Sequence, residues 1–257
     1  MTATETNAVL EMRDVSVSFT SGAGAKRRTV RAMNGVTLDV APGETLGLVG
    51  ESGSGKTTTA AVALGLRAPD SGEVRLLGRP LSRSRKATAG KIQTVLQHPH
   101  WSLNPRRRVG ESVREPLTVA RRDLSREQQR ARVGEILEHV GLNPGFAERY
   151  PHELSGGQRQ RVSVARALIT EPRFIVFDEA VSALDVAVQL QILSLIRELQ
   201  QEHRFGALFI SHDLGAVQRV ADRVAVLFRG DLVETAPTEH FFDAPAHPYS
   251  QQLLESL

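Results

Sequence analysis

The sequence predicts an α/β fold with a mostly parallel sheet, an antiparallel β subdomain at the N-terminal side and an inserted α-helical subdomain. Three observations support this prediction. Short apolar segments indicate strands buried on both faces of a parallel sheet, at 45–50, 174–179 and 207–212. Segments of alternating polarity indicate antiparallel strands, at 9–19 and 36–40. Apolar residues at helical spacing indicate helices, at 126–142, 158–169 and 186–202.

The order of these elements also predicts the domain organisation. A polar connection with glycine and arginine separates the first two strands, and the mostly helical stretch at about 100–170 interrupts the series of buried strands. We therefore expect a flexible N-terminus at 1–8, one domain at 9–235 that carries the helical insert, and a short C-terminal extension at 236–257.

Composition restricts the class of protein. The chain has 257 residues, a formal charge of +3 and no cysteine, so a disulfide, a cysteine-ligated zinc and a cysteine-held iron–sulfur cluster are excluded. The high isoelectric point of about 9.7 reflects arginine, which does not titrate near neutrality. The first residues lack the features of a secretory signal, and the apolar runs are shorter than the roughly 20 residues that span a bilayer. We expect a cytoplasmic protein whose membrane association comes through a partner.

The strongest chemical signal is a glycine-rich loop, GESGSGKT, between an apolar strand and a helical run. It matches the G-x-x-x-x-G-K-[ST] pattern of a P-loop, whose amides and helix N-terminus bind phosphates. Lys56 is expected to reach the β- and γ-phosphates, and the Thr57 hydroxyl to bind Mg²⁺. The predicted ATP-binding set is Gly50, Glu51, Ser52, Gly53, Ser54, Gly55, Lys56, Thr57 and Thr58.

Two neighbouring carboxylates end the apolar strand at 174–179. They are expected at the carboxyl edge of the sheet, where ligands of parallel α/β sheets bind. Because adjacent strand residues point to opposite faces, the two groups can have different tasks. Asp178 is assigned to Mg²⁺, and Glu179 to the attacking water as general base. A solvated acidic pair in a loop is the alternative.

A second glycine-rich turn, LSGGQ, opens the helix at 158–169. Ser155 and Gln158 fit a capping box, so an ordinary helix start is one interpretation. The pair Gly156-Gly157 costs backbone entropy that a cap does not require. Free amides and a hydroxyl at a helix N-terminus suit a γ-phosphate, and the first loop already has its own nucleotide. We therefore expect the second turn to close over ATP held by another subunit, in a head-to-tail pair.

These motifs together resemble the ATP-binding-cassette (ABC) ATPases. The P-loop, LSGGQRQR, FIVFDE, SALD and ISHD occur in the order typical of that family, over residues from about 9 to 230. The resemblance implies that Gln97 senses the γ-phosphate and Mg²⁺, that Asp185 contacts the second subunit, and that His212 is a catalytic switch histidine. It also implies that Phe19 stacks on adenine. From the residue types alone, a structural histidine and a core phenylalanine are the alternatives.

Two further segments, 102–117 and 246–254, resemble the importer ATPases that serve dipeptides, oligopeptides or nickel. His98 and Ala180 depart from that subgroup, which usually has an acidic residue and a proline at these positions. The resemblance implies an ATP-hydrolysing subunit that works with a second ABC ATPase subunit, identical or homologous, with permease subunits, and indirectly with a solute-binding protein. Its expected location is the cytoplasmic face of the membrane.

Other interpretations remain at this point. Trp101 is either a core aromatic or part of a permease contact. The arginines at 106–108 and 121–132 allow a nucleic-acid surface, but interleaved acidic residues favour a solvated helix face, and no nucleic acid is expected. A soluble ABC-type ATPase acting on nucleic acid or ribosomes is the alternative function. A non-hydrolysing regulatory cassette is disfavoured, because Lys56, Asp178, Glu179 and His212 are all present.

Overall fold

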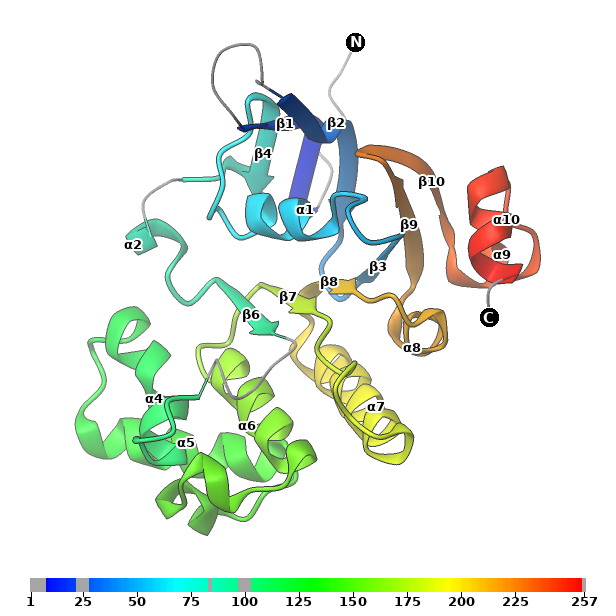
Figure 1. Ribbon diagram of the computed structural model, residues 1–257. Helices are drawn as coiled ribbons and strands as arrows, with labels where there is room; N and C mark the ends of the chain where they lie inside the picture. The colour runs from blue at the N-terminus through cyan, green and yellow to red at the C-terminus, as the bar shows by residue number, and fades with distance from the viewer. Residues whose placement is uncertain (1–7, 22–27, 83–84, 97–102, 256–257) are drawn as a thin grey trace. The chain divides into compact units, whose positions relative to one another are not determined.

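The structure is a computed structural model that describes residues 8–21, 28–82, 85–96 and 103–255. The chain forms two compact units (Figure 1). The first comprises Met1–Arg83 and Gly206–Leu257, and the second comprises Ser84–Phe205. The first unit is therefore made of two segments that are far apart in the sequence, and the second is one continuous segment.

An antiparallel sheet forms one part of the first unit. Its strand order is β2-β1-β4-β5. The strands are β1 (Leu10–Ser21), β2 (Arg28–Val40), β4 (Ser71–Leu76) and β5 (Arg79–Pro80). Met12, Val17 and Val36 are fully or almost fully buried. The pairing of β1 with β2 shifts register between Met12 and Val17, so the alternation of buried residues is interrupted there. The predicted antiparallel pair is confirmed, and β2 starts earlier than predicted.

A parallel group of strands forms the other part of this unit. Strand β3 (Thr45–Val49) lies between β8 (Gly206–Ile210) and β9 (Arg223–Phe228), parallel to both. Strand β10 (Asp231–Pro237) is antiparallel to β9. Every residue of β3 and β8 is buried. This confirms the prediction that their unbroken apolar runs are buried strands of a parallel sheet. The helices of this unit are α1 (Lys56–Ala63), α8 (Leu214–Val220), α9 (Thr238–Asp243) and α10 (Pro248–Glu255).

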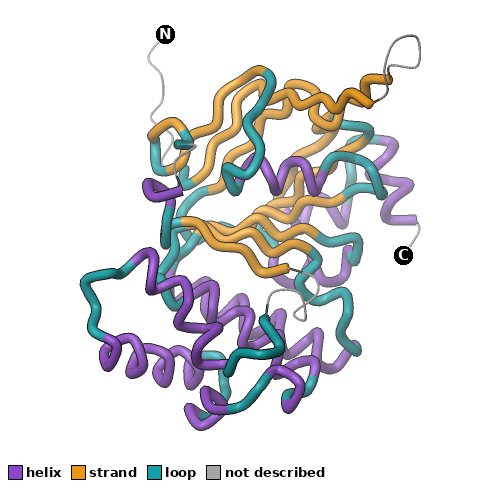
Figure 2. Tube along the Cα trace, turned by 60° about the vertical axis from the view of Figure 1, so that its left-hand side comes forward, coloured by secondary structure: helices purple, strands orange, loops and turns teal. Residues whose placement is uncertain are grey.

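The second unit is mostly helical (Figure 2). Its strands β6 (Ile92–Leu96) and β7 (Phe174–Asp178) are parallel neighbours. Its helices are α2 (Arg85–Thr88), α4 (Val109–Ala120), α5 (Arg126–His139), α6 (Gly156–Leu168) and α7 (Val186–His203), with 3-10 turns η2 (Pro144–Glu148) and η3 (Pro151–Glu153). Ser125 and Asp185 cap α5 and α7 by accepting from backbone amides, so both helices start where polar caps precede apolar spacing.

The α/β class and the types of the predicted elements are confirmed, although several boundaries differ by a few residues. The helix predicted at 126–142 ends at His139, because Gly141 turns the chain with a φ of 73°. The helix predicted at 158–169 begins at Gly156. The strand predicted at 174–179 ends at Asp178. The predicted domain limit at 235 falls inside β10, and the proposed domain limits remain predictions. Within the described ranges, no helix is long and apolar enough to cross a bilayer.

Candidate functional site

The glycine-rich loop joins β3 to α1, as predicted. Gly50, Gly53 and Gly55 have φ angles of 145°, 79° and 115°, which disfavour residues with a side chain. A Cβ at Gly50 would lie 2.2 Å from the Leu227 carbonyl oxygen, and one at Gly55 would lie 2.3 Å from that of Ala32. The loop backbone therefore passes directly against two other segments of the first unit, and only glycine allows that approach.

Lys56 lies over its own loop. Its Nζ donates to the carbonyl oxygens of Gly50 at 2.6 Å and Glu51 at 2.8 Å, and its side chain is buried. The N-terminus of α1 has no side-chain cap, since Gly55 is its N-cap residue. Its first amides and the lysine ammonium thus provide the positive end of an anion site. Thr57 is exposed and Thr58 half-buried at this end, and Ser52 and Gly53 are exposed in the loop.

Tyr249 of α10 fixes the start of the same loop. Its hydroxyl accepts a hydrogen bond from the Glu51 amide at 2.9 Å. Its ring packs on Phe228, with 4.2 Å between centroids, and the residue is 5% exposed. Burial raises the pKa of Tyr249, the Glu51 charge adds to that effect, and the Glu51 hydrogen bond opposes it. The peptide groups on both sides of Glu51 are therefore held, its amide by Tyr249 and its carbonyl by Lys56.

Helix α10 is itself fixed by β10. The Glu234 carboxylate accepts from the amides of Ala246 at 2.9 Å and His247 at 3.0 Å. Burial alone would raise the pKa of Glu234, but the neighbouring Ser250 hydroxyl and these two amides outweigh it and hold the pKa below its usual value. From the sequence, the segment 246–254 indicated only membership of a subgroup, and the contact of Tyr249 with the loop was not predicted. The available signal was the resemblance of this tyrosine-containing segment to one subgroup of importer ATPases.

Phe19 lies near the end of β1 and is 46% exposed. The alternative that it is a core residue is therefore wrong. The Arg67 guanidinium lies over its ring, 4.7 Å from the centroid, and donates to the Ser18 carbonyl oxygen at 3.2 Å. An exposed ring backed by a cation suits stacking with a planar group. Its assignment to adenine remains a prediction.

Asp178 and Glu179 have different backbone settings in the second unit. Asp178 is the last residue of β7 and pairs with Leu96 of β6. Glu179 lies beyond the strand, with a left-handed φ of 49°. The alternation argument for opposite faces therefore does not apply to Glu179, because a turn and not the pleat directs its side chain. The Ser182 hydroxyl and amide donate to the Glu179 carbonyl oxygen at 3.0 and 3.2 Å, which stabilises this turn. A left-handed glutamate costs about 1–2 kcal/mol, and such strain is common at functional positions.

The LSGGQ turn forms the predicted capping box at the start of α6. Ser155 Oγ accepts from the Gln158 amide at 3.2 Å, and Gln158 Oε1 accepts from the Ser155 amide at 2.9 Å. The Gly156 and Gly157 amides, as the first two of the helix, have no carbonyl one turn earlier to bond. A Cβ at Gly157 would lie 2.6 Å from Val188 Cγ1. The second glycine thus also has a packing role against α7, which was not predicted from the sequence.

The remaining predicted residues are placed as follows. Asp185 is exposed, and its Oδ1 accepts from the Val188 amide at 3.0 Å as the cap of α7. His212 is exposed, two residues after β8, and its catalytic role stays a prediction. Gln97, His98 and Trp101 lie outside the described residues. Ala180 is buried.

The structure groups these residues by unit. Phe19, the loop at 50–58, His212 and Tyr249 belong to the first unit. Asp178, Glu179, Asp185 and the LSGGQ turn belong to the second. Within the first unit, the structure brings the loop, Lys56 and Tyr249 together.

Several of the arginines that suggested nucleic acid are paired with acidic residues. Arg107 and Arg166 both bind Glu115, at 3.5 and 2.9 Å. Arg121 binds Asp123 at 3.0 Å and Arg132 binds Glu171 at 3.2 Å, while Arg108 pairs with Glu148. These pairs are partly exposed and contribute little to stability. They reduce the free positive charge of these arginines, as expected for a solvated helix surface.

Comparison with known proteins agrees with the geometry of the phosphate-binding loop and the LSGGQ turn. The family described as "ABC transporter" matches residues 33–182, which is more than half of the chain. The chain belongs to the ABC transporter family. It is an ATP-binding and ATP-hydrolysing member of that family, and the soluble nucleic-acid alternative is not supported.

Curated relatives cover nearly all of this ABC ATPase. A putative peptide import ATP-binding protein of Brucella abortus is 49% identical over 236 residues, covering 90% of this chain and 70% of the relative. The oligopeptide transport ATP-binding protein AppF of Bacillus subtilis is 43% identical over 265 residues, covering 100% and 80%. The corresponding protein OppF of Escherichia coli is 42% identical over 258 residues, covering 97% and 77%. The resemblance to importer ATPases is therefore confirmed.

Solved structures show the same fold. A dimeric ATP-binding cassette in a post-hydrolysis state with ADP and phosphate aligns with a TM-score of 0.76 and 27% identity, covering 89% of this chain and 98% of that one. The cbiO1 protein of Clostridium perfringens, part of an ABC transporter complex, aligns with a TM-score of 0.82 and 25% identity, covering 93% and 92%. These matches confirm the predicted P-loop ATPase fold.

Proposed function

We propose that this ABC ATPase energises the import of peptides through a membrane permease. The observation that carries the proposal is the preformed phosphate loop, in which Lys56 and Tyr249 hold both peptide groups of Glu51. The peptide substrate class is supported by relatives named as peptide or oligopeptide import and transport proteins. Nickel is the weaker alternative, since no relative quoted above carries that name.

The proposed roles follow from chemistry at each position. Lys56 and the amides of 50–58 bind the phosphates, and Phe19 stacks on adenine. Glu179 accepts a proton from the attacking water, while His212 and Gln97 contact the γ-phosphate region. The Thr57 hydroxyl and the Asp178 carboxylate are the hard oxygen ligands that Mg²⁺ prefers, and Gln97 is the third proposed ligand. Mg²⁺, when bound with ATP, would neutralise charge that develops on the phosphates.

The assembly is proposed as a pair of ATPase subunits on a permease. The Ser155 hydroxyl, already accepting from the Gln158 amide, still has its own hydrogen to donate to a phosphate oxygen. With Gly156, Gly157, Gln158 and Asp185, it would complete the ATP site of the second subunit. A dimeric cassette among the solved relatives supports this arrangement. The pair would sit at the cytoplasmic face of the membrane, with a solute-binding protein delivering the cargo.

The particle mass of purified Glu179→Gln protein, with and without Mg-ATP, tests the shared-site proposal. An ATP-dependent dimer is the expected result, because slowed hydrolysis preserves the closed state. The double variant Lys56→Ala/Glu179→Gln is the control and should stay monomeric with ATP. If Glu179→Gln protein binds ATP but remains a monomer, self-pairing is rejected, and a homologous second subunit must be sought.

The transport proposal is tested by ATPase activity with the permease and binding protein present. Oligopeptide added to vesicles that contain the complete complex should stimulate hydrolysis and accumulate inside them. DNA or RNA should leave the activity unchanged. Accumulation of nickel but not of peptide would contradict the peptide assignment while leaving the ATPase assignment intact.

A further inference from the structure

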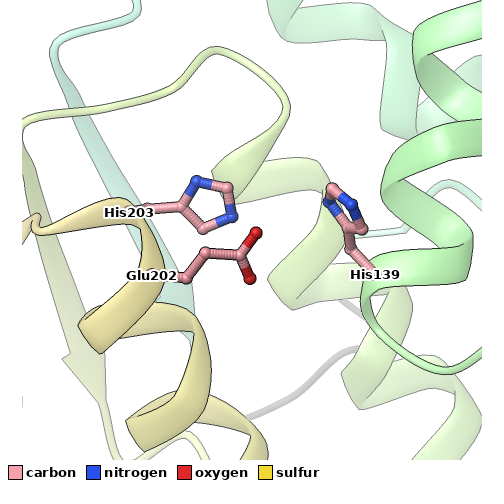
Figure 3. Close-up of side chains that lie close together, drawn as sticks. All are labelled: His139, Glu202 and His203. Atoms are coloured by element: carbon pink, nitrogen blue, oxygen red, sulfur yellow. The ribbon is translucent and has the colours of Figure 1, made fainter.

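A cluster of metal-binding side chains lies in the second unit, among residues that have no role in the ATP site. It consists of His139, Glu202 and His203, whose candidate ligand atoms all lie within 4.8 Å of one another. His139 is the last residue of α5, and Glu202 and His203 end α7. Figure 3 shows the two residues of α7 on one side and His139 opposite, with the Glu202 carboxylate directed into the space between the rings.

Two independent features make this cluster attractive to a cation. His203 Nε2 is inaccessible to solvent and has no hydrogen-bond partner among the described residues, which is costly for a buried polar atom. Two helices of 14 and 18 residues also end here, and a helix C-terminus carries partial negative charge. A bound cation would satisfy the nitrogen and interact favourably with both helix ends.

We propose that His139, Glu202 and His203 bind a late first-row transition metal ion, with Zn²⁺ as the ordinary occupant. Two imidazoles and one carboxylate are a ligand set that Zn²⁺ accepts, with water in the fourth position. Mg²⁺ would not compete, because it prefers oxygen ligands in a strict octahedron. Among divalent ions of the first row, nitrogen sites favour copper, nickel and zinc over manganese and iron.

The geometry requires only a small closure around the ion. Zinc–ligand bonds of about 2.0–2.1 Å place tetrahedral ligand atoms roughly 3.4 Å apart. The imidazole centroids of His139 and His203 are 6.1 Å apart and tilted by 53°, so the rings are not stacked on each other. His139 and Glu202 are exposed and can rotate, whereas His203 is half-buried. The site would therefore form by the two exposed side chains turning toward His203.

Binding would link the last turn of α5 to the last turn of α7. The Val140 carbonyl at the end of α5 accepts from Arg161 Nη1 at 2.6 Å, so the proposed site uses side chains and not this carbonyl. A link between two segments about 60 residues apart in sequence favours the folded state, because the unfolded chain does not present the ligands together. The Tm should therefore rise when Zn²⁺ is added, and it should return to the metal-free value when a chelator removes the ion.

The test is a titration of the full chain, without nucleotide and with any polyhistidine tag removed, using ZnCl₂ in a calorimeter. One saturable site per chain is expected. His203→Gln and His139→Gln should each weaken Zn²⁺ binding by more than about 100-fold, since they remove a direct ligand and even the loss of a supporting residue costs about 10–100-fold. His152→Gln changes an exposed histidine of the same unit and should leave affinity unchanged.

Co²⁺ gives a second readout that is independent of stability. The wild-type chain should show the visible absorption of tetrahedral Co²⁺, and His203→Gln should lose it. Glu202→Gln keeps the size of an exposed side chain, so this variant should fold and should weaken Zn²⁺ binding. It therefore tests the site even if a histidine variant does not fold. The proposal would be overturned if the wild-type chain had no saturable Zn²⁺ site. It would also be overturned if His203→Gln and Glu202→Gln bound Zn²⁺ as tightly as the wild type does.

Discussion

The hydrogen bond between Tyr249 and the phosphate-binding loop leads to a sharp prediction. Tyr249→Phe removes one hydroxyl and keeps the ring packed on Phe228. A neutral hydrogen bond contributes about 0.5–1.5 kcal/mol. If this hydrogen bond holds the Glu51 peptide in its binding conformation, part of the ATP-binding free energy must be used to order that peptide in the variant. The Kd for ATP should then rise about 2- to 10-fold, since 1.4 kcal/mol is about a factor of ten.

The measurement is ATP binding by calorimetry without Mg²⁺, together with steady-state kinetics. KM should rise in step with Kd while kcat at saturating ATP changes little, because the loop is ordered once ATP is bound. Tyr150→Phe is the matched control: it is the other tyrosine of the chain, it stacks on His152 in the second unit, and it should leave Kd unchanged. A purely structural Tyr249 would instead lower Tm by about 2–4 °C per kcal/mol at unchanged Kd, and that result would refute the reasoning.

Other predictions concern catalysis and stability. Glu179→Gln should abolish turnover while ATP still binds, and undiminished turnover in a rate assay would reject the base assignment. Lys56→Ala should weaken ATP binding itself, so an unchanged Kd would argue against the phosphate cradle. Phe19→Ala should weaken the binding of ATP more than the binding of inorganic triphosphate, because only ATP has a base to stack. Equal losses of affinity would contradict base stacking. The lowered pKa of Glu234 means that its contribution to stability is present above the unfolded pKa and is lost as pH falls through the folded value. Glu234→Gln should therefore flatten the acid limb of a Tm-against-pH curve.

Local patterns in the sequence predicted much of this protein. The strand–loop–helix at 45–63 and the capping box of Ser155 and Gln158 are encoded by neighbouring residues, and both were confirmed. Contacts between distant residues were not predictable in this way. Tyr249 lies 198 residues from Glu51, and nothing in either segment specifies the other. The left-handed backbone of Glu179 was also missed, because a run of apolar residues followed by two acids is typical of a strand.

Gly157 shows a related difficulty. From sequence, two glycines in a helix start suggested an anion site, since a cap alone does not need them. In the structure, the second glycine also allows α6 to approach Val188 of α7. One residue type thus serves a backbone requirement and a packing requirement at once, and sequence alone does not separate the two.

The close approach of the loop to Leu227 and Tyr249 has a consequence for synthesis of the protein. The Ser54 carbonyl also accepts from the Gly230 amide at 2.9 Å, so the loop is enclosed by segments that leave the ribosome much later than it does. Contacts with such large sequence separation form slowly and late. A nascent chain that exposes the GESGSGKT segment but not yet Leu227, Gly230 and Tyr249 should therefore bind ATP weakly, and full nucleotide affinity would mark the completion of folding.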